Sequence, residues 1–377
     1  MPDLLAKANA LGRAAQYDLC SSCGTSATRV RDDIGRWIYP AIMPDGRRVQ
    51  LFKVLLTNVC ERDCGYCANR SGRDVPRATF TPDELAVTFA ELLQRRMATG
   101  LFLSSAVCHS TERTMERMIA AVEIVRRRYA FRGYVHLKIL PGASRATVER
   151  ATQVATRVSL NLEAPNPERL AALSLTKGFE SDLLQRMWWA REFMLQQGNA
   201  PAGQTTLFVV GAAGEADREI LATTARLYRE LGLQRAYYSA FQPVPRTPLE
   251  NLPPASPLRE HRLYQGDFLL HQYGFGEEEL VYDARGNLPL EADPKQAWAQ
   301  AHPEWFPLEV NCADREALLR VPGIGPKTAA RIIAARRQHR VRDLETLRRL
   351  GVVAQRAAPY VLLDGHLPPV QLGLWHG

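Results

Sequence analysis

The chain has 377 residues, of which 46% are hydrophobic and 23% charged, and its formal net charge is +8. This length suits two to three domains, and no apolar run approaches the roughly 20 residues that a membrane-spanning helix needs. Residues 1–19 lack the basic start, apolar middle and small-residue cleavage site of a signal peptide. We therefore expect a cytoplasmic protein with no membrane partner, whose thiols stay reduced.

The positive charge is concentrated near the C-terminus. Residues 311–377 contain 11 Lys/Arg and 5 Asp/Glu, a net charge of +6, which leaves 37 and 35, a net charge of +2, for residues 1–310. A basic region is typical of proteins that bind polyanions, but it also occurs where it serves only solubility. Charge alone leaves both interpretations open.

Between residues 50 and 245, short β-rich runs alternate with helical patterns. We predict strands at 51–57, 101–105, 134–139, 157–163, 205–210 and 236–242. The helical patterns lie at 81–97, 111–129, 144–155, 179–197 and 214–231, and the first opens with the N-cap sequence Thr81-Pro82-Asp83-Glu84. Six β–α units predict an α/β fold with a parallel sheet, in the form of a partial (β/α)6 barrel. Chemistry in such a fold lies on loops at the C-terminal ends of the strands.

The alternation of β-rich runs and helical patterns stops after residue 245, which suggests that the chain is divided into four regions. We predict an N-terminal extension at 1–50, a barrel at 51–250, a Pro-rich linker with an accessory helix at 251–310, and an all-α domain at 311–377.

Three cysteines follow the first predicted strand directly. Cys60, Cys64 and Cys67 lie within eight residues, and Gly65 allows the backbone between them to turn tightly. A structural zinc site normally takes four protein ligands and disulfides take cysteines in pairs, so three thiols fit neither well. Three thiolates can instead hold three corners of a [4Fe–4S] cluster and leave one iron for a non-protein ligand. A zinc or redox cysteine cluster is the alternative.

This spacing, C-x3-C-x2-C after the first strand, resembles the hallmark of the radical S-adenosylmethionine (SAM) superfamily. The resemblance implies a partial barrel, a [4Fe–4S] cluster on Cys60, Cys64 and Cys67, SAM chelated by the open iron, and an electron donor. It further implies that reductive cleavage of SAM gives a 5′-deoxyadenosyl radical that abstracts hydrogen from a substrate. Tyr66 would place its ring beside the cluster.

Polar side chains on the predicted strands are candidate SAM ligands. Asn161 and Glu163 alternate with apolar residues and would point into the barrel, which branched apolar side chains normally fill. They are similar to the superfamily's polar fourth-strand residues, which contact SAM; an internal hydrogen-bond network is the alternative. Ser104 and Ser105 stand where the superfamily often has a Gly-Gly-Glu-like element. Gly211 is similar to its adenine-side glycine.

Further candidates are less specific. Lys138 shares a strand face with His136 and could contact the SAM carboxylate, pair with Glu163 or face solvent. Cys108, in the loop after the second strand, could donate hydrogen to a substrate radical or be inert. Cys20 and Cys23 could form half of an auxiliary metal site.

A second motif lies in the basic region. The sequence from Leu318 to Arg337, LLRVPGIGPKTAARIIAARR, resembles the helix-hairpin-helix motif of DNA repair and recombination proteins. The resemblance implies that the turn at Gly323, Ile324 and Gly325, with Lys327 and Thr328 at the start of the next helix, binds a DNA phosphate. Backbone N–H groups at a helix N-terminus form such an anion site. Ile324 would anchor the turn in the core.

Residues 343–362 look like a degenerate second copy, with Leu350-Gly351-Val352 at the turn. Paired hairpins follow a duplex by its phosphates and do not read bases. A small packing domain that binds a protein is the alternative.

Together, the two motifs resemble the family of DNA modification/repair radical SAM proteins. That resemblance implies hydrogen abstraction from a modified or damaged nucleotide in DNA, and a uracil-DNA-glycosylase-like partner protein. Three alternatives remain open. They are an RNA-modifying radical SAM enzyme, a radical SAM enzyme that acts on a small molecule or protein and uses the hairpin for docking, and an iron–sulfur DNA-binding protein without radical chemistry.

Overall fold

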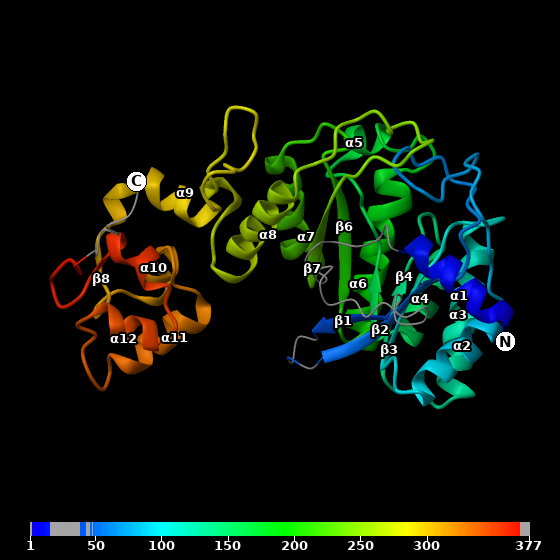
Figure 1. The fold of residues 1–377 in the computed structure, drawn as a ribbon, viewed down its shortest axis with the longest axis horizontal. Coiled ribbons are helices and arrows are strands. Elements are labelled where there is room, and N and C mark those ends of the chain that lie inside the picture. Colours follow the sequence, from blue (N-terminus) through cyan, green and yellow to red (C-terminus); the bar gives the residue numbers. More distant parts are fainter. Residues whose placement is uncertain (1, 16–37, 43–45, 47, 370–377) are drawn as a thin grey trace. The chain divides into compact units, whose positions relative to one another are not determined.

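The computed structural model describes residues 2–15, 38–42, 46 and 48–369 (Figure 1). The chain forms two compact units: Met1–Glu215 with Arg226–Glu260, and Ala216–Ala225 with His261–Gly377. Residues 261–310, most of the predicted linker region, therefore belong to the same unit as the hairpin sequence. No described helix combines the length and apolar character that crossing a bilayer requires.

The first unit is built on one seven-stranded sheet whose strand order follows the chain. Strands β2 to β7 are parallel, and β1 runs antiparallel to β2 at the edge. The strands are β1 (Ile38–Ile42), β2 (Arg48–Leu55), β3 (Gly100–Ser104), β4 (Tyr134–Lys138), β5 (Arg157–Ser159), β6 (Gln204–Val210) and β7 (Arg235–Ala240). The six parallel strands are those predicted, and the α/β partial-barrel fold is confirmed.

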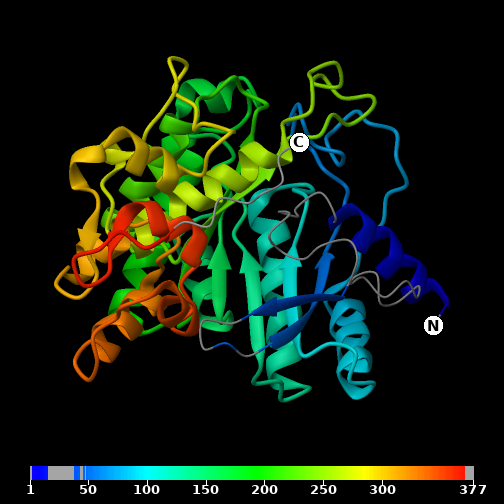
Figure 2. The ribbon, with the colours of Figure 1, turned by 60° about the vertical axis from the view of Figure 1, so that its left-hand side comes forward.

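Helices follow the parallel strands, and α2, α3, α4 and α6 pack beside one another along the sheet (Figure 2). Thr81 and Glu84 form a reciprocal capping box that starts α2 at Pro82, as the N-cap sequence indicates. The helices are α1 (Pro2–Ala15), α2 (Pro82–Gln94), α3 (Thr111–Arg127), α4 (Arg145–Val154), α5 (Pro167–Ala171), the π-helix η5 (Phe179–Leu184), α6 (Gln185–Gln197) and α7 (Asp217–Leu231, of which the part from Arg226 belongs to this unit).

Two elements of the predicted N-terminal extension belong to this unit. Helix α1 packs on β2 through buried residues that include Leu11 and Ala15. Strand β1 extends the sheet, with Ile38 opposite Phe52 and Ile42 opposite Arg48. Burial of one face of α1 and pairing of β1 tie both segments to the barrel.

The second unit contains the hairpin sequence. Its elements are α8 (Pro257–Gln272, from His261 onward), the 3-10 helices η6 (Glu277–Glu279) and η7 (Pro303–Trp305), α9 (Pro294–Ala301), β8 (Leu308–Glu309), α10 (Arg315–Arg320), α11 (Pro326–Ala335), α12 (Leu344–Arg349), α13 (Ala354–Ala357), η8 (Ala358–Tyr360) and β9 (Val361–Leu362). The parallel pair β8–β9 joins the two ends of this helical region.

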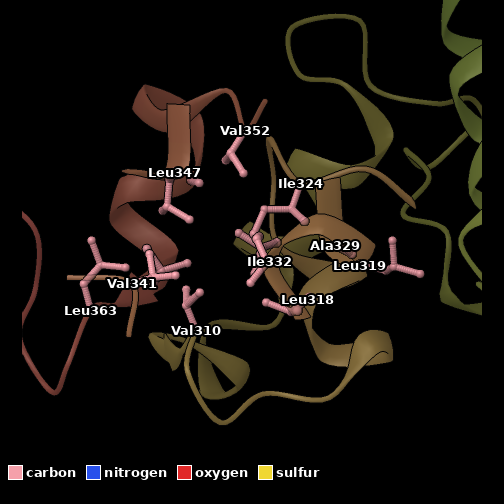
Figure 3. Packing of buried hydrophobic residues seen from close by; sticks show 13 residues of the cluster. Val310, Leu318, Leu319, Ile324, Ala329, Ile332, Val341, Leu347, Val352 and Leu363 are labelled. Atoms are coloured by element: carbon pink, nitrogen blue, oxygen red, sulfur yellow. The ribbon is translucent and has the colours of Figure 1, made fainter. Parts of the chain in front are cut away.

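One hydrophobic cluster fills the space between α10, α11 and α12 (Figure 3). Ile324 is 1% exposed and lies beside Ile332 of α11 and Leu318 of α10, while Leu347 and Val352 enter the same cluster from the second hairpin sequence. The predicted anchoring of the turn by Ile324 agrees with this burial. Both hairpin sequences therefore share one core.

Candidate functional site

A cavity of about 290 Å³ opens at the C-terminal ends of the parallel strands of the first unit. Cys60, Cys64 and Cys67 all line it, from the segment between β2 and α2, which we call the cysteine loop (residues 56–80). The strand ends contribute Leu55, Ser104, Lys138, Val209 and Ala240. This is where a parallel α/β barrel places its chemistry.

One arginine organises the cysteine loop. The Arg77 guanidinium donates hydrogen bonds to the carbonyl oxygens of Asn69 at 2.9 Å, Arg70 at 3.0 Å and Arg73 at 2.8 Å, and to that of Asn58. Four carbonyls from both ends of the loop therefore converge on one side chain. Sequence reasoning missed Arg77, because its partners are backbone atoms and leave no motif.

Asp63 joins the cysteine loop to the loop that follows α5. Its carboxylate accepts hydrogen bonds from Ser174 Oγ at 2.5 Å, Thr176 Oγ1 at 2.7 Å and the Leu175 N–H at 2.9 Å. Partial burial opposes ionisation, but these hydrogen bonds to the charged form outweigh it and lower the pKa of Asp63 to about 2. The two loops are thus fixed together beside the cavity.

The environment of the thiols suits a bound metal centre, which would keep them deprotonated. Burial raises the pKa of Cys64, and burial together with the neighbouring thiols raises that of Cys67 to about 12. Without a cation, both groups would therefore stay protonated. The backbone N–H of Arg62 lies 3.4 Å from Cys60 Sγ, and that of Asn69 lies 3.4 Å from Cys67 Sγ. Such N–H groups stabilise metal-bound thiolate sulfur.

The spacing of the thiols favours a cluster over a single ion. Among the described His, Cys, Asp and Glu residues, one set of three has its potential ligand atoms within 4.8 Å of one another. This set is Glu61, Cys108 and His109, and it does not include the thiols of the cysteine loop. The cysteine-loop thiols are therefore spread more widely. A tetrahedral zinc ion would need sulfur atoms about 4 Å apart, given its short Zn–S bonds. Three thiolates that lie farther apart can each bind a different iron of a [4Fe–4S] cluster.

A buried ion pair lies beside the thiols. Lys177 Nζ is 2.6 Å from Glu163 Oε2, and both side chains are less than 10% exposed. Burial disfavours the charged lysine, but the negative charge of Glu163 and its hydrogen bond to the ammonium outweigh this and raise the pKa of Lys177. The pKa of Tyr66 is raised by burial and by the nearby Glu163 carboxylate. Sequence reasoning named Lys138 as one possible partner of Glu163 and missed Lys177, which the structure pairs with Glu163.

Glu163 also has an unusual backbone. Its φ is +67°, in the left-handed region, and its N–H and C=O bond to Leu207 and Val209 of β6. Non-glycine residues held in this region cluster at functional sites, where the surrounding structure maintains them. Glu163 lines the cavity in this conformation.

Most of the other predicted SAM-site residues also line the cavity. They are Tyr66, Ser104, Ser105, Lys138 and Asn161. Their placement brings polar groups from several strand ends and the cysteine loop to one space. Their contacts with SAM remain a prediction.

Two predicted residues do not line the cavity. Cys108 is half-buried beside Glu61 and His109. Gly211 has a φ of +91°, and a Cβ there would lie 2.7 Å from the Ala255 Cβ, so this glycine permits a close approach of two backbone segments. Cys20 and Cys23 lie outside the described residues.

The first hairpin turn in the second unit contains a glycine that packing requires. Gly323 has a φ of +88°, and a Cβ there would lie 2.6 Å from the Val353 carbonyl oxygen. The Gly325 N–H donates to Thr328 Oγ1 at 2.7 Å, so the side chain of Thr328 caps this end of α11. Lys327, in the first turn of α11, is exposed.

The second hairpin turn interlocks with the first. Gly351 has a φ of +91°, and a Cβ there would meet Arg331 Nη1 at 3.0 Å and Thr328 Cγ2 at 3.3 Å, both from α11. In return, the Val353 N–H donates to the Gly323 carbonyl oxygen at 3.1 Å. Each glycine turn therefore packs against the other hairpin sequence, and the identity of residues 343–362 as a second copy of the motif stays a prediction.

Comparisons with known protein families agree with the predictions for the barrel and for the hairpin sequence. The model of the radical SAM superfamily matches residues 54–227, and that of the helix-hairpin-helix motif matches residues 310–335. The chain therefore contains a radical SAM domain followed by a helix-hairpin-helix motif. These matches agree with the predicted radical SAM enzyme and its cofactors, a [4Fe–4S] cluster and SAM. No curated protein matches the chain in sequence.

Several solved structures are similar to the chain. They include HydG, a maturase of the [FeFe]-hydrogenase (13% identity, TM-score 0.47), methylornithine synthase PylB (16%, 0.47), and the radical SAM methyltransferase TsrM from Kitasatospora setae with tryptophan substrate and a SAM analogue bound (15%, 0.41). The matches cover 58%, 58% and 56% of this chain, and 49%, 61% and 39% of those chains, respectively. The chain thus spans less than two thirds of the length of each of these proteins.

Proposed function

We propose that the protein is a radical SAM enzyme that abstracts hydrogen from a modified or damaged nucleotide in duplex DNA. The main support for this proposal is that one chain combines a cavity lined by three thiols with two hairpin sequences that pack together in a basic region. We further propose an electron donor, a uracil-DNA-glycosylase-like partner protein and a cytoplasmic location, as the resemblance implies.

In the barrel, Cys60, Cys64 and Cys67 would hold the cluster. When bound, the cluster and SAM supply a 5′-deoxyadenosyl radical as the hydrogen-abstracting group. Arg77 holds the cysteine loop through its hydrogen bonds to backbone carbonyls, and Asp63 ties this loop to the one after α5. Both contacts orient the thiols before the cofactors bind, and such preorganisation limits the rearrangement needed on binding.

The cavity residues would bind and orient SAM. The methionine part of SAM carries a positively charged amino group and a negatively charged carboxylate. The Glu163–Lys177 pair offers a negative charge for the first and a positive charge for the second. Asn161, Ser104 and Ser105 add neutral hydrogen-bonding groups to the same cavity. A charged ligand taken from water into such a buried site requires partners of this kind.

In the second unit, the hairpins would bind phosphates. The start of α11 offers backbone N–H groups beside the exposed Lys327, and the region 311–377 carries a net charge of +6. Such contacts carry no base information, so we expect binding that is independent of sequence.

Fluorescence anisotropy with duplexes of equal length and scrambled sequence tests the DNA assignment. We expect similar affinities for all sequences and a steep fall in affinity with added salt. Tighter binding to duplex RNA than to duplex DNA would favour the RNA-modifying alternative. Absence of binding to either would leave the hairpins as a docking region for a protein, and would contradict the proposal.

A further inference from the structure

A buried lysine from outside the hairpin sequence contacts the first hairpin turn. Lys295 is the second residue of α9, and it is 8% exposed. Its Nζ donates a hydrogen bond to the Ile324 carbonyl oxygen at 2.5 Å. Ile324 is the central residue of the Gly323-Ile324-Gly325 turn, so α9 fixes the backbone of the proposed phosphate site.

Tyr273, just after α8, supports the same turn. Its ring centroid lies 4.7 Å from Lys295 Nζ, within the range of a cation–π contact. Its hydroxyl oxygen lies 3.2 Å from the position that a Cβ on Gly325 would occupy. Tyr273 and Lys295 therefore lie together against the turn, on the side of α9.

The charged groups around Lys295 leave its ammonium without a direct counter-ion. Asp293, at the N-cap of α9, pairs with Arg356 of α13, and Arg320 of α10 pairs with Glu279. Among the described residues, no carboxylate forms an ion pair with Lys295. Burial lowers the pKa of Lys295 to about 7, with Asp293 opposing the shift and Arg356 and Arg320 adding to it.

We propose that Lys295 is a positioning residue of the phosphate site on the first hairpin. It holds the Ile324 carbonyl, and its ammonium provides a buried positive charge that a phosphate bound at the turn balances. This inference rests on the proposed function, because it assumes that the hairpin binds DNA.

The proposal predicts that DNA binding takes up a proton. A phosphate favours the ammonium over the neutral amine, so the pKa of Lys295 rises when DNA binds. At pH 6 most of the free protein already carries this proton, and binding takes up little. Above about pH 7 the free protein has lost it, so binding restores it, and affinity falls by up to tenfold for each pH unit.

Isothermal titration calorimetry of the full chain with a duplex of about 20 base pairs measures this uptake. Titrations in buffers of different ionisation enthalpy, at pH 6, 7, 8 and 9 and constant ionic strength, give the number of protons bound. For the unmodified protein we expect uptake that approaches one proton at pH 8 and is smaller at pH 6.

Two lysine variants separate positioning from simple charge. Lys295→Gln keeps a hydrogen-bond donor for the Ile324 carbonyl but removes the charge, so we expect the uptake at pH 8 to disappear and affinity at pH 6 to fall severalfold. Lys327→Gln removes an exposed charge of the same hairpin. It should weaken binding by a similar factor at every pH and leave the proton uptake intact.

The outcomes distinguish this inference from the proposed function. Absence of duplex binding by the unmodified protein at every pH would overturn both. Duplex binding with equal proton uptake in the unmodified protein and in Lys295→Gln would overturn the role of Lys295 alone. If Lys295→Gln fails to fold, the proton uptake of the unmodified protein still tests the proposal. Duplex binding without proton uptake between pH 7 and 9 would contradict it.

Discussion

At the scale of single residues, the three cysteines carry the cofactor assignment. Their thiols line one cavity, and burial raises the pKa of Cys64 and Cys67, so that a cation must hold them deprotonated. This environment differs from that of Cys312, which is exposed. The contrast gives a matched pair of cysteine variants.

Cys60→Ala, Cys64→Ala and Cys67→Ala should each abolish formation of 5′-deoxyadenosine from SAM by the reduced protein. Each variant removes one of three cluster ligands, whereas Cys312→Ala removes an exposed thiol that does not line the cavity. Iron analysis after anaerobic reconstitution, with chromatography of the SAM products, checks this. Full activity in any of the three variants would contradict the cluster assignment.

The Glu163–Lys177 pair is the second residue-scale feature. Glu163→Gln leaves Lys177 buried without its counter-ion, and removing one partner of a buried pair destabilises a protein by roughly 3–5 kcal/mol. We also expect SAM affinity to fall about tenfold or more, since contacts to a charged group contribute roughly 1.5–3 kcal/mol. Equilibrium binding of SAM to reconstituted protein measures the effect.

Glu123→Gln is the matched control, because Glu123 pairs with Arg150 on the surface at 3.1 Å. It should change neither SAM affinity nor stability appreciably, as exposed pairs contribute little. Unchanged SAM affinity in Glu163→Gln, with lost stability, would show that the pair serves only the internal hydrogen-bond network.

Asp63 gives a pH-dependent prediction. Its pKa is lowered on folding to about 2, so the ionised carboxylate stabilises the folded state above the pKa of the unfolded chain, near 4. That contribution is lost as the pH falls from about 4 toward 2. Asp63→Asn should therefore lower the melting temperature at pH 7, and the difference from the unmodified protein should shrink below about pH 4. A difference that stays constant across this range would contradict the account.

At the scale of elements, the glycine turns decide how the hairpins pack. Gly323 and Gly365 have similar φ values, +88° and +82°. A Cβ on Gly323 would lie 2.6 Å from the Val353 carbonyl oxygen, whereas a Cβ on Gly365 would meet nothing within 4 Å. The two positions therefore share backbone strain and differ in steric fit.

Gly323→Ala should weaken duplex DNA binding strongly, because the clash separates the two hairpins. Gly365→Ala should retain most of the affinity, although both variants introduce a side chain at positive φ. SAM cleavage should persist in both. Anisotropy titrations at one salt concentration compare them, and equal affinities for the two variants would contradict the proposed role of the turn.

The elements also show what the sequence could predict. The alternation of β-rich runs and helical patterns predicted strands β2 to β7 because a parallel barrel repeats one unit, and Thr81 with Glu84 predicted the start of α2. The pattern did not predict α1 or β1. Their placement depends on packing against β2, which a local pattern does not contain.

At the scale of the whole molecule, motifs with fixed spacing were predictable and long-range partners were not. Cys60, Cys64 and Cys67 follow from spacing, and the inward row at Asn161 and Glu163 from strand periodicity. Three further residues act through contacts with residues distant along the chain or with backbone oxygens: Lys177, Arg77 and Lys295. Neither kind of partner leaves a periodic signal in the sequence.

The central claim is that the radical SAM domain takes hydrogen from DNA, and deuterium transfer tests it most directly. Reduced, reconstituted protein is incubated with SAM and perdeuterated genomic DNA, both intact and damaged by irradiation or deamination, with perdeuterated RNA in parallel. Mass spectrometry then measures deuterium in 5′-deoxyadenosine. The account predicts label from DNA, above all from damaged DNA; label from RNA alone, or unlabelled 5′-deoxyadenosine with every nucleic acid, would contradict it.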